Sequence, residues 1–284
     1  MLKKIMNRSE SLTHKHLSQI CNNHNLGVYP KVRLADIFSI EGSGISKELF
    51  SFALKAHFDF TVTNSDGVPI LAVEFDGVQH ESEKQQARDI MKDALCERFG
   101  LPSLRITSEY INKEYEHMNL LSWLIETWLA LNDYNKAKAR GEIDYYDTFS
   151  HVAVLSVPGR EENFPLWLSR RVRGKFFNLG IKKKIQDIMP SFIIWLDEPN
   201  NLYYGISWVK IEQNTTAVAK MQIKSQNFPV PIFELLTDIV TIQLYDNLKE
   251  ILNDERPPVL HEELEAELLH YDSLYKRFFY AGQK

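Results

Sequence analysis

Cysteine is scarce in this sequence, and long apolar segments are missing. Cys21 and Cys96 are the only cysteines among 284 residues, and they lie far apart without metal-ligand spacing. A disulfide framework or a zinc finger is therefore not expected, and a reducing compartment fits this usage. The opening stretch MLKKIMNRSESLTHKH has lysines but lacks the apolar core of a signal peptide, and apolar runs such as FIIWL cannot span a bilayer. We expect a cytoplasmic protein that makes no membrane contact.

Neither sign of charge dominates overall, but both are distributed unevenly. The formal net charge of −5 argues against a protein whose whole surface coats a polyanion. Residues 160–184, however, hold eight Lys or Arg and two Glu, whereas residues 254–272 hold seven acidic residues and one Arg. These local asymmetries indicate contact surfaces for particular partners.

Apolar spacing predicts alternating helices and strands in the first half of the chain. Two strands are expected around the turn-forming sequence NSDG, at about 56–63 and 69–76. The other expected elements are an extended segment over 27–38, a short strand over 101–106, and helices over about 9–22, 81–100 and 114–141. This order predicts an α/β domain over residues 1–141.

The second half of the chain begins after an expected domain boundary at 141–150. Residues 151–157, HVAVLSV, have the alternation of a strand. The elements expected after them are a basic helical segment over about 165–189, strands over 191–197, 202–211 and 216–223, and helices over about 231–253 and 260–278. They predict a smaller α+β domain over residues 150–284.

Acidic residues gather at one end of the expected hairpin. AVEFDGVQH, residues 72–80, is an apolar strand that carries Glu74 and Asp76 at its end and reaches His80 soon afterwards. Asp59 is expected mid-strand between two Phe, where an uncompensated charge would be costly. Pairing around the turn would bring Asp59 and Glu74 together, and two close carboxylates favour a hard divalent cation such as Mg²⁺ or Mn²⁺. The simpler interpretation is a solvated turn, because Asp-Gly is a common turn pair.

Basic residues near these acids complete the set of groups used in metal-assisted phosphodiester hydrolysis. Arg88 and Lys92 lie one turn apart on the expected helix, and Arg105, at the end of the third strand, would contact a phosphate or pair with an acid. His80 would act as general base or cap the following helix. Asp76 would bind a metal directly, bind it through water, or orient His80. The helix face could equally be a solvated surface with i,i+4 ion pairs.

Four motifs in order resemble the PD-(D/E)XK nuclease superfamily, in the branch near the very-short-patch repair endonucleases. They are FDF at 58–60, VEFDGVQH at 73–80, RDIMKDAL at 88–95 and GLPSLRI at 100–106. Together they are similar to the DF … IExDG … H … RD..K … GLP.LRI pattern of an uncharacterised bacterial domain family, and VYPKVRLADIF is similar to its lead-in. The resemblance covers about residues 28–106. It also matches Glu10 to the superfamily's helical acid, although less specifically.

The resemblance implies a restriction-endonuclease-like fold, with a mixed sheet flanked by helices, that cuts nucleic acid with Mg²⁺ or Mn²⁺. It assigns the two metal-binding acids to Asp59 and Glu74. Asp76 stands where the superfamily motif has a lysine, so another residue must take over that role. His80 and Lys92 are the candidates.

The expected function is therefore that of a metal-dependent endonuclease acting on DNA, in repair, restriction or anti-phage defence by analogy. RNA stays open as a substrate. The alternative is a non-catalytic nucleic-acid-binding or assembly subunit that keeps the fold, which the missing motif lysine favours. A third reading is a module that docks a protein partner or a second copy through the C-terminal domain.

The basic segment RRVRGKFFNLGIKKK could follow a nucleic-acid backbone, with its two Phe packing or stacking. A basic helix face over a phenylalanine core explains it equally well, as does contact with the acidic C-terminal segment. The candidate phosphate contacts in this segment are Arg170, Arg171, Arg173, Lys182, Lys183 and Lys184.

Overall fold

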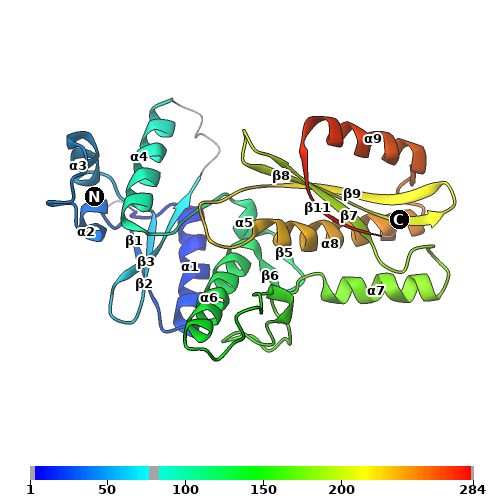
Figure 1. Ribbon diagram of the computed structural model, residues 1–284, viewed down its shortest axis with the longest axis horizontal. Coiled ribbons are helices and arrows are strands. Elements are labelled where there is room, and N and C mark those ends of the chain that lie inside the picture. Colours follow the sequence, from blue (N-terminus) through cyan, green and yellow to red (C-terminus); the bar gives the residue numbers. More distant parts are fainter. Residues whose placement is uncertain (1–3, 77–82, 283–284) are drawn as a thin grey trace. The chain divides into compact units, whose positions relative to one another are not determined.

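The computed structural model describes residues 4–76 and 83–282, and the chain divides into two compact units (Figure 1). The first unit comprises Met1–Glu114, Met118–Leu166 and Gln226–Val230, and the second comprises Tyr115–His117, Trp167–Ser225 and Pro231–Lys284. The stretch 141–150, where a boundary was expected, lies inside the first unit. Among the described helices, none combines the length and the apolar character that crossing a membrane requires.

A four-stranded mixed sheet organises the first unit, and the expected α/β fold is confirmed. Its strands are β1 (Gly27–Pro30), β2 (Phe60–Thr63), β3 (Pro69–Phe75) and β4 (Ser103–Ile106), hydrogen-bonded in that order. The pairs β1–β2 and β2–β3 are antiparallel, whereas β3 and β4 are parallel. A parallel pair needs a crossover connection, and α4 (Glu83–Phe99) lies within the connection between β3 and β4.

The β2–β3 hairpin forms around the expected turn NSDG. The side-chain oxygen of Asn64 accepts hydrogen bonds from two backbone N–H groups of the turn, at 2.9 and 3.0 Å. Gly67 adopts a φ of 79°, a left-handed conformation that costs glycine little. A register shift between Val62 and Thr63 follows the turn, and beyond it the ladder ends with Phe60 paired with Val73. Asp59 and Glu74, the two expected metal-binding acids, come directly after this pair at the open end of the hairpin.

The first unit also contains α1 (Arg8–Asn23), α2 (Leu34–Ile37), α3 (Lys47–Ala53), α5 (Glu109–Asn112) and α6 (Leu120–Ala139). The helix expected from residue 114 starts later, because the Asn119 side chain caps α6 by accepting a hydrogen bond from the Ser122 N–H at 2.8 Å. Before it, β5 (Glu114–Tyr115) and β6 (Met118–Asn119) pair as a two-stranded sheet. Residues 27–38 were expected to be extended throughout, but the end of this segment forms α2, which corrects the expectation.

A five-stranded sheet organises the second unit, in the order β10-β9-β8-β7-β11 with every neighbouring pair antiparallel. Alternate residues of β8 and β9 point to opposite faces: Val209 and Ala219 pack with α7 and α8, and Ile206 and Trp208 pack with Leu264 of α9. The elements are α7 (Arg170–Ile181), β7 (Ser191–Asp197), β8 (Leu202–Glu212), β9 (Thr215–Lys224), α8 (Ile232–Leu252), β10 (Val259–Leu260), α9 (His261–Leu274) and β11 (Lys276–Ala281).

Two expectations for the second half were wrong. Residues 151–157 do not form a strand; they begin with a single 3₁₀ turn, η1 (His151–Ala153), in which the buried His151 packs edge-on against Trp123 with ring centres 5.4 Å apart. The helix expected over 260–278 ends at Leu274, and the chain continues as β11, which pairs with β7. In both places packing against another segment outweighs the local pattern.

A hydrogen-bonded contact between a histidine and a buried glutamate ties α1 to α6. His24, which follows the last turn of α1, lies with its Nε2 2.7 Å from Oε2 of Glu126, and the Glu126 side chain is only 1% exposed. A buried carboxylate needs such a partner, because removing it from water is costly. The pair therefore helps to hold α1, and with it the helix start that carries Glu10, against the rest of the unit.

We expect His24→Ala to lower the free energy of unfolding by about 3 kcal/mol, because it leaves the Glu126 carboxylate buried without its partner. Urea-induced unfolding followed by circular dichroism measures this loss. Arg33→Ala is the control, since Arg33 pairs with Asp36 on the surface, where both side chains are 52% exposed, and it should cause no measurable change. A loss in His24→Ala no larger than in the control would contradict the assigned role of the pair.

Candidate functional site

Asp59 and Glu74 lie near each other at the open end of the β2–β3 hairpin, as the sequence predicted. Asp59 lies one residue before β2 and not in mid-strand, which corrects the expectation. Its Oδ2 accepts a hydrogen bond from the backbone N–H of Phe75 at 2.9 Å. The Asp59 carboxylate is therefore fixed by the neighbouring strand, which positions it beside Glu74.

Lys31, the residue after β1, connects Asp59 to α1. Its Nζ lies 2.5 Å from Oδ1 of Asp59 and 2.7 Å from Oε1 of Glu10. Glu10 is held in place by a capping box, in which Asn7 and Glu10 each accept a hydrogen bond from the backbone N–H of the other, at 2.9 and 2.8 Å. One ammonium group thus joins two carboxylates that come from separate segments of the chain.

Glu74 has its own ammonium partner, Lys92, which α4 projects toward the end of β3. The Nζ of Lys92 lies 2.5 Å from Oε1 of Glu74, and the two residues are 6% and 7% exposed. The same ammonium lies 5.6 Å from the centre of the Phe58 ring, a cation–π distance. Lys92, one of the two residues expected to replace the motif lysine, therefore lies in direct contact with the predicted second metal ligand.

The surroundings push the pKa values of the two acids in opposite directions. Burial raises the pKa of Glu74 to about 7, because the nearby charge and hydrogen bond of Lys92 offset only part of the cost of desolvation. Burial also acts to raise the pKa of Asp59, but the hydrogen bonds from Lys31 and the Phe75 N–H, together with the charge of Lys31, outweigh it and lower that pKa. Near neutral pH, Asp59 is a fixed anion and Glu74 exchanges a proton.

Arg105 lies beside Glu74 in the parallel pair of β3 and β4, where their Cα atoms are partners. Its guanidinium contacts α4, with Nη1 2.9 Å from Oδ1 of Asp89 and Nη2 2.8 Å from Oδ1 of Asp93. Burial acts to lower the pKa of Arg105, but the hydrogen bonds that its guanidinium donates to these two acids hold that pKa above its ordinary value. Two roles were expected for Arg105, contact with a phosphate or pairing with an acid. The structure shows the second, and the acids are Asp89 and Asp93 of α4.

Two further candidates border this site. Asp76 follows β3, is half-buried, and donates its backbone N–H to the carbonyl of Ile106 at 2.7 Å. Arg88, on α4, has its guanidinium carbon 5.9 Å from the centre of the Phe52 ring. His80 lies outside the described residues.

His57 is a titratable residue near the two acids that was not predicted from the sequence. It lies two residues before Asp59 in an extended segment, and its backbone bridges to Arg33. Burial and the charges of Lys31 and Lys92 lower the pKa of His57, while the charge of Asp59 acts in the opposite direction. The alternation in HFDF was the available signal, because residues two apart in extended chain point to the same side.

The basic segment belongs to the second unit, on α7 and the residues after it. Five of its six candidate phosphate contacts are exposed, and Arg173 is the exception. Its Nε lies 2.8 Å from Oγ of Ser169, and burial lowers the pKa of Arg173 in spite of the nearby charge of Asp238. The exposed members are Arg170, Arg171, Lys182, Lys183 and Lys184.

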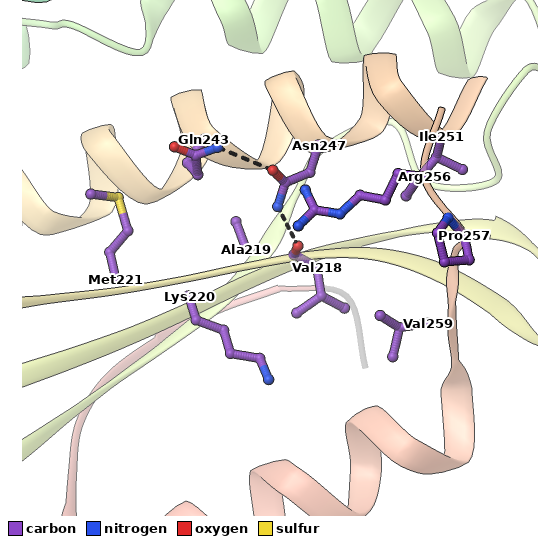
Figure 2. A pocket seen from close by; sticks show the side chains of 10 residues that line it. All are labelled: Val218, Ala219, Lys220, Met221, Gln243, Asn247, Ile251, Arg256, Pro257 and Val259. Atoms are coloured by element: carbon purple, nitrogen blue, oxygen red, sulfur yellow. Dashed lines mark hydrogen bonds between the residues drawn. The ribbon is translucent and has the colours of Figure 1, made fainter. Parts of the chain in front are cut away.

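Two pockets lined by described residues lie away from the paired acids. A pocket of about 500 Å³ in the second unit is lined by residues of β9, α8 and the segment before β10 (Figure 2). There the Asn247 amide donates a hydrogen bond to the carbonyl of Val218 at 2.8 Å and accepts one from Gln243 at 3.0 Å. A pocket of about 780 Å³ in the first unit borders Asn64 and Pro69, at the turn end of the β2–β3 hairpin. Neither of these two pockets is lined by Asp59 or Glu74.

Carboxylates and ammonium groups therefore alternate at the open end of the hairpin. Among the described residues, no three His, Cys, Asp or Glu side chains are grouped as metal ligands. Mg²⁺ is commonly held by only one or two protein carboxylates together with water and phosphate oxygens. Asp59 and Glu74 suit that requirement.

Comparison with protein families and with known proteins gives one match. Residues 2–121 match the model of a family described as "Protein of unknown function (DUF2726)". This range includes Glu10, Lys31, Asp59, Glu74 and Lys92. No curated protein and no solved structure matches the chain.

The raised pKa of Glu74 predicts a pH dependence of stability. Between pH 4.5 and 7 the folded state keeps the proton that the unfolded state has lost, so the stabilisation is present at low pH and disappears as the pH rises through 7. We expect the free energy of unfolding of the wild type, measured relative to Glu74→Gln, to fall by up to about 3 kcal/mol from pH 5 to pH 8.

Urea unfolding at a series of pH values, with EDTA present, measures this difference. Glu97→Gln is the matched control, since Glu97 is an exposed residue on α4, and its difference from the wild type should not vary with pH. A Glu74→Gln difference that stays constant from pH 5 to pH 8 would show that Glu74 titrates at its ordinary pKa.

Proposed function

We propose that this protein is a divalent-metal-dependent endonuclease that hydrolyses phosphodiester bonds in DNA. The observation that carries the proposal is the position of Asp59, Glu74 and Lys92 at one end of the β2–β3 hairpin, with the Lys92 ammonium 2.5 Å from Glu74. Two acids and a lysine at the open edge of a mixed sheet agree with the resemblance to PD-(D/E)XK nucleases. The two buried, unpaired cysteines fit the reducing conditions of the cytoplasm.

The donor groups at this site fit Mg²⁺ or Mn²⁺. Asp59 and Glu74 offer hard carboxylate oxygens, and the cations that they contact in this structure are the ammonium groups of Lys31 and Lys92. Asp59 and Glu74 would hold the metal, and Glu10, which shares the Lys31 ammonium group with Asp59, would supply a further carboxylate oxygen beside it. The metal, when bound, supplies a water of lowered pKa and stabilises negative charge on the phosphate.

The residues of the chain would position and neutralise the substrate. Lys92 would offset the charge of the scissile phosphate, which the superfamily lysine does in the position that Asp76 takes here. Asp76 cannot do this, because its side chain is an acid. Arg88 would extend the positive charge along α4 toward the neighbouring phosphate.

Substrate binding would involve the exposed cations of the second unit. Arginine and lysine side chains that neutralise phosphates release counterions, which makes binding strong at low salt. The exposed stretch Lys182–Lys184 follows α7 and fits this role, whereas Arg173 is turned toward Ser169. DNA is proposed over RNA from the resemblance alone, as are roles in repair, restriction or anti-phage defence.

The second candidate is a non-catalytic nucleic-acid-binding or assembly subunit. The observation that favours it is the neutralisation of Asp59 and Glu74 by lysines that belong to the chain itself. A fold that has lost its metal could keep its acids as structural ion pairs in this way. The two candidates differ in whether cleavage accompanies binding.

We expect the purified protein to cleave DNA only with Mg²⁺ or Mn²⁺, and we expect Asp59→Asn or Glu74→Gln to lower the rate at least about 100-fold. Cleavage of plasmid and of labelled duplexes, with and without EDTA, measures this. Asp66→Asn is the matched control, because Asp66 is exposed in the turn at the other end of the same hairpin. Full activity in EDTA, or in either site variant, would exclude the metal site. Binding without cleavage would favour the second candidate.

Lys92→Met and His80→Ala should each lower the cleavage rate by about 100-fold, the range of a positioned acid–base group. Metal affinity should change much less than in Asp59→Asn. If His80 is the base, the wild-type rate rises through pH 6 to 7 and this inflection disappears in His80→Ala.

An inflection that persists in His80→Ala would belong to Glu74, whose pKa is about 7, since the rate would then follow ionisation of that ligand. Near-normal rates in both variants would show that neither residue replaces the motif lysine.

A further inference from the structure

We propose that Lys31 is a built-in counter-cation of the acidic site, and that a divalent cation must displace its ammonium group from Glu10 and Asp59 in order to bind. The inference rests on the metal site of the proposed function. It adds a competition between a residue of the chain and the metal, which sets the metal concentration at which the site fills.

The contacts of Lys31 place its charge where a metal would be held. Its Nζ lies 2.7 Å from an oxygen of Glu10 and 2.5 Å from an oxygen of Asp59, so it bridges two carboxylates. These oxygens are the groups that a hard divalent cation would use. An ammonium group and a metal ion cannot occupy the same space, so binding of one excludes the other.

Both carboxylates are held in place independently of Lys31. The second oxygen of Glu10 accepts a hydrogen bond from the Asn7 N–H at 2.8 Å, and the second oxygen of Asp59 accepts one from the Phe75 N–H at 2.9 Å. Backbone donors therefore keep the two acids oriented when the lysine leaves. The acids form a prepared pair of ligands, and Lys31 is the exchangeable part.

The accessibility of the two lysines decides which one exchanges. The Lys31 side chain is 26% exposed, whereas that of Lys92 is 8% exposed and lies over the Phe58 ring. A lysine at the surface can swing its ammonium into water on a flexible four-carbon chain. Lys92, enclosed between the helix and the strand, has no comparable freedom. Lys31 is therefore the cation that yields to a metal.

The backbone of Lys31 is unusual in a way that supports a dedicated role. Its φ is 55°, in the left-handed region that residues other than glycine, asparagine and aspartate seldom adopt. The Lys31 N–H donates to the carbonyl of Asp59 at 2.9 Å, so this conformation is anchored beside the acid that its side chain contacts. Six other non-glycine residues in the described part of the chain also have a positive φ, so the link to the site comes from this hydrogen bond and not from the φ alone.

The experiment measures Mn²⁺ binding by calorimetry to the full chain, in the wild type and in Lys31→Asn. Asparagine suits the left-handed backbone and removes the charge. We expect Lys31→Asn to bind Mn²⁺ at least about 10-fold more tightly, because a unit positive charge within a few ångströms of the metal is gone. Its melting temperature should be lower in EDTA and should rise more on adding Mn²⁺ than that of the wild type.

Two control variants test whether the effect comes from the charge of residue 31. Lys31→Arg keeps the charge and should bind Mn²⁺ within about 3-fold of the wild type. Lys47→Asn removes the charge of an exposed lysine at the start of α3, in the same unit, and should leave Mn²⁺ affinity unchanged. If Lys31→Asn does not fold, Lys31→Gly removes the charge with the same tolerance of the backbone.

The outcomes distinguish this inference from the proposed function. Equal or weaker Mn²⁺ binding by Lys31→Asn, with wild-type binding that depends on Asp59, would overturn the competition and leave the metal site standing. Tighter binding in Lys31→Arg would also overturn it. If Lys31→Asn binds Mn²⁺ more tightly than the wild type and Lys31→Arg does not, the competition is supported. If the wild type in addition cleaves no nucleic acid, the nuclease function is rejected. No Mn²⁺ binding by any variant would reject both.

Discussion

Burial of the Glu74 carboxylate at the end of β3 is the constraint on which the rest of the site depends. An isolated carboxylate so deeply enclosed would be costly, and Lys92 reduces that cost from a helix that crosses over the same strand. The contact connects α4 to the sheet at the point where β3 and β4 run parallel. It also leaves Arg105, the partner of Glu74 in the neighbouring strand, to pair with acids of that helix. Geometry and charge at this edge of the sheet therefore follow from one buried pair.

The two acids of the hairpin differ because their surroundings differ. Asp59 receives a backbone N–H and the ammonium of Lys31, both of which favour its charged form. Glu74 receives one ammonium but is more deeply buried, so its pKa lies near neutral pH. Two neighbouring carboxylates with separated pKa values are typical of sites that perform acid–base chemistry. The difference is produced by the deeper burial of Glu74 and by the Lys31 ammonium group and the Phe75 N–H, which contact Asp59.

Much of this arrangement followed from the sequence. The turn chemistry of NSDG predicted the hairpin, but a register shift between Val62 and Thr63 is also needed to bring Asp59 beside Glu74. Helical spacing in α4 placed Lys92 and Arg88 one turn apart, and the reach of Lys92 back to the strand end agrees with that expectation. Local patterns were sufficient here because the elements are short, adjacent in the chain and connected by tight turns.

The sequence did not predict features that depend on contacts between distant segments. Lys31 contacts Glu10 and Asp59 from a left-handed backbone conformation after β1. No neighbouring residue in the sequence predicts that conformation. Arg173 occurs in a run of cationic residues, yet its guanidinium contacts Ser169 and lies near the charge of Asp238 on α8. Residues 151–157 alternate like a strand, but His151 is held instead against Trp123. Side-chain reach and packing decide these positions.

The most direct test of the account is a crystal of the full chain soaked in Mn²⁺ and measured at a wavelength where manganese scatters anomalously. We expect an anomalous peak in coordination contact with Asp59 and Glu74, and we expect the Lys31 ammonium group to have moved away from Asp59. An empty site, with both lysine contacts unchanged while manganese binds elsewhere in the same crystal, would contradict it.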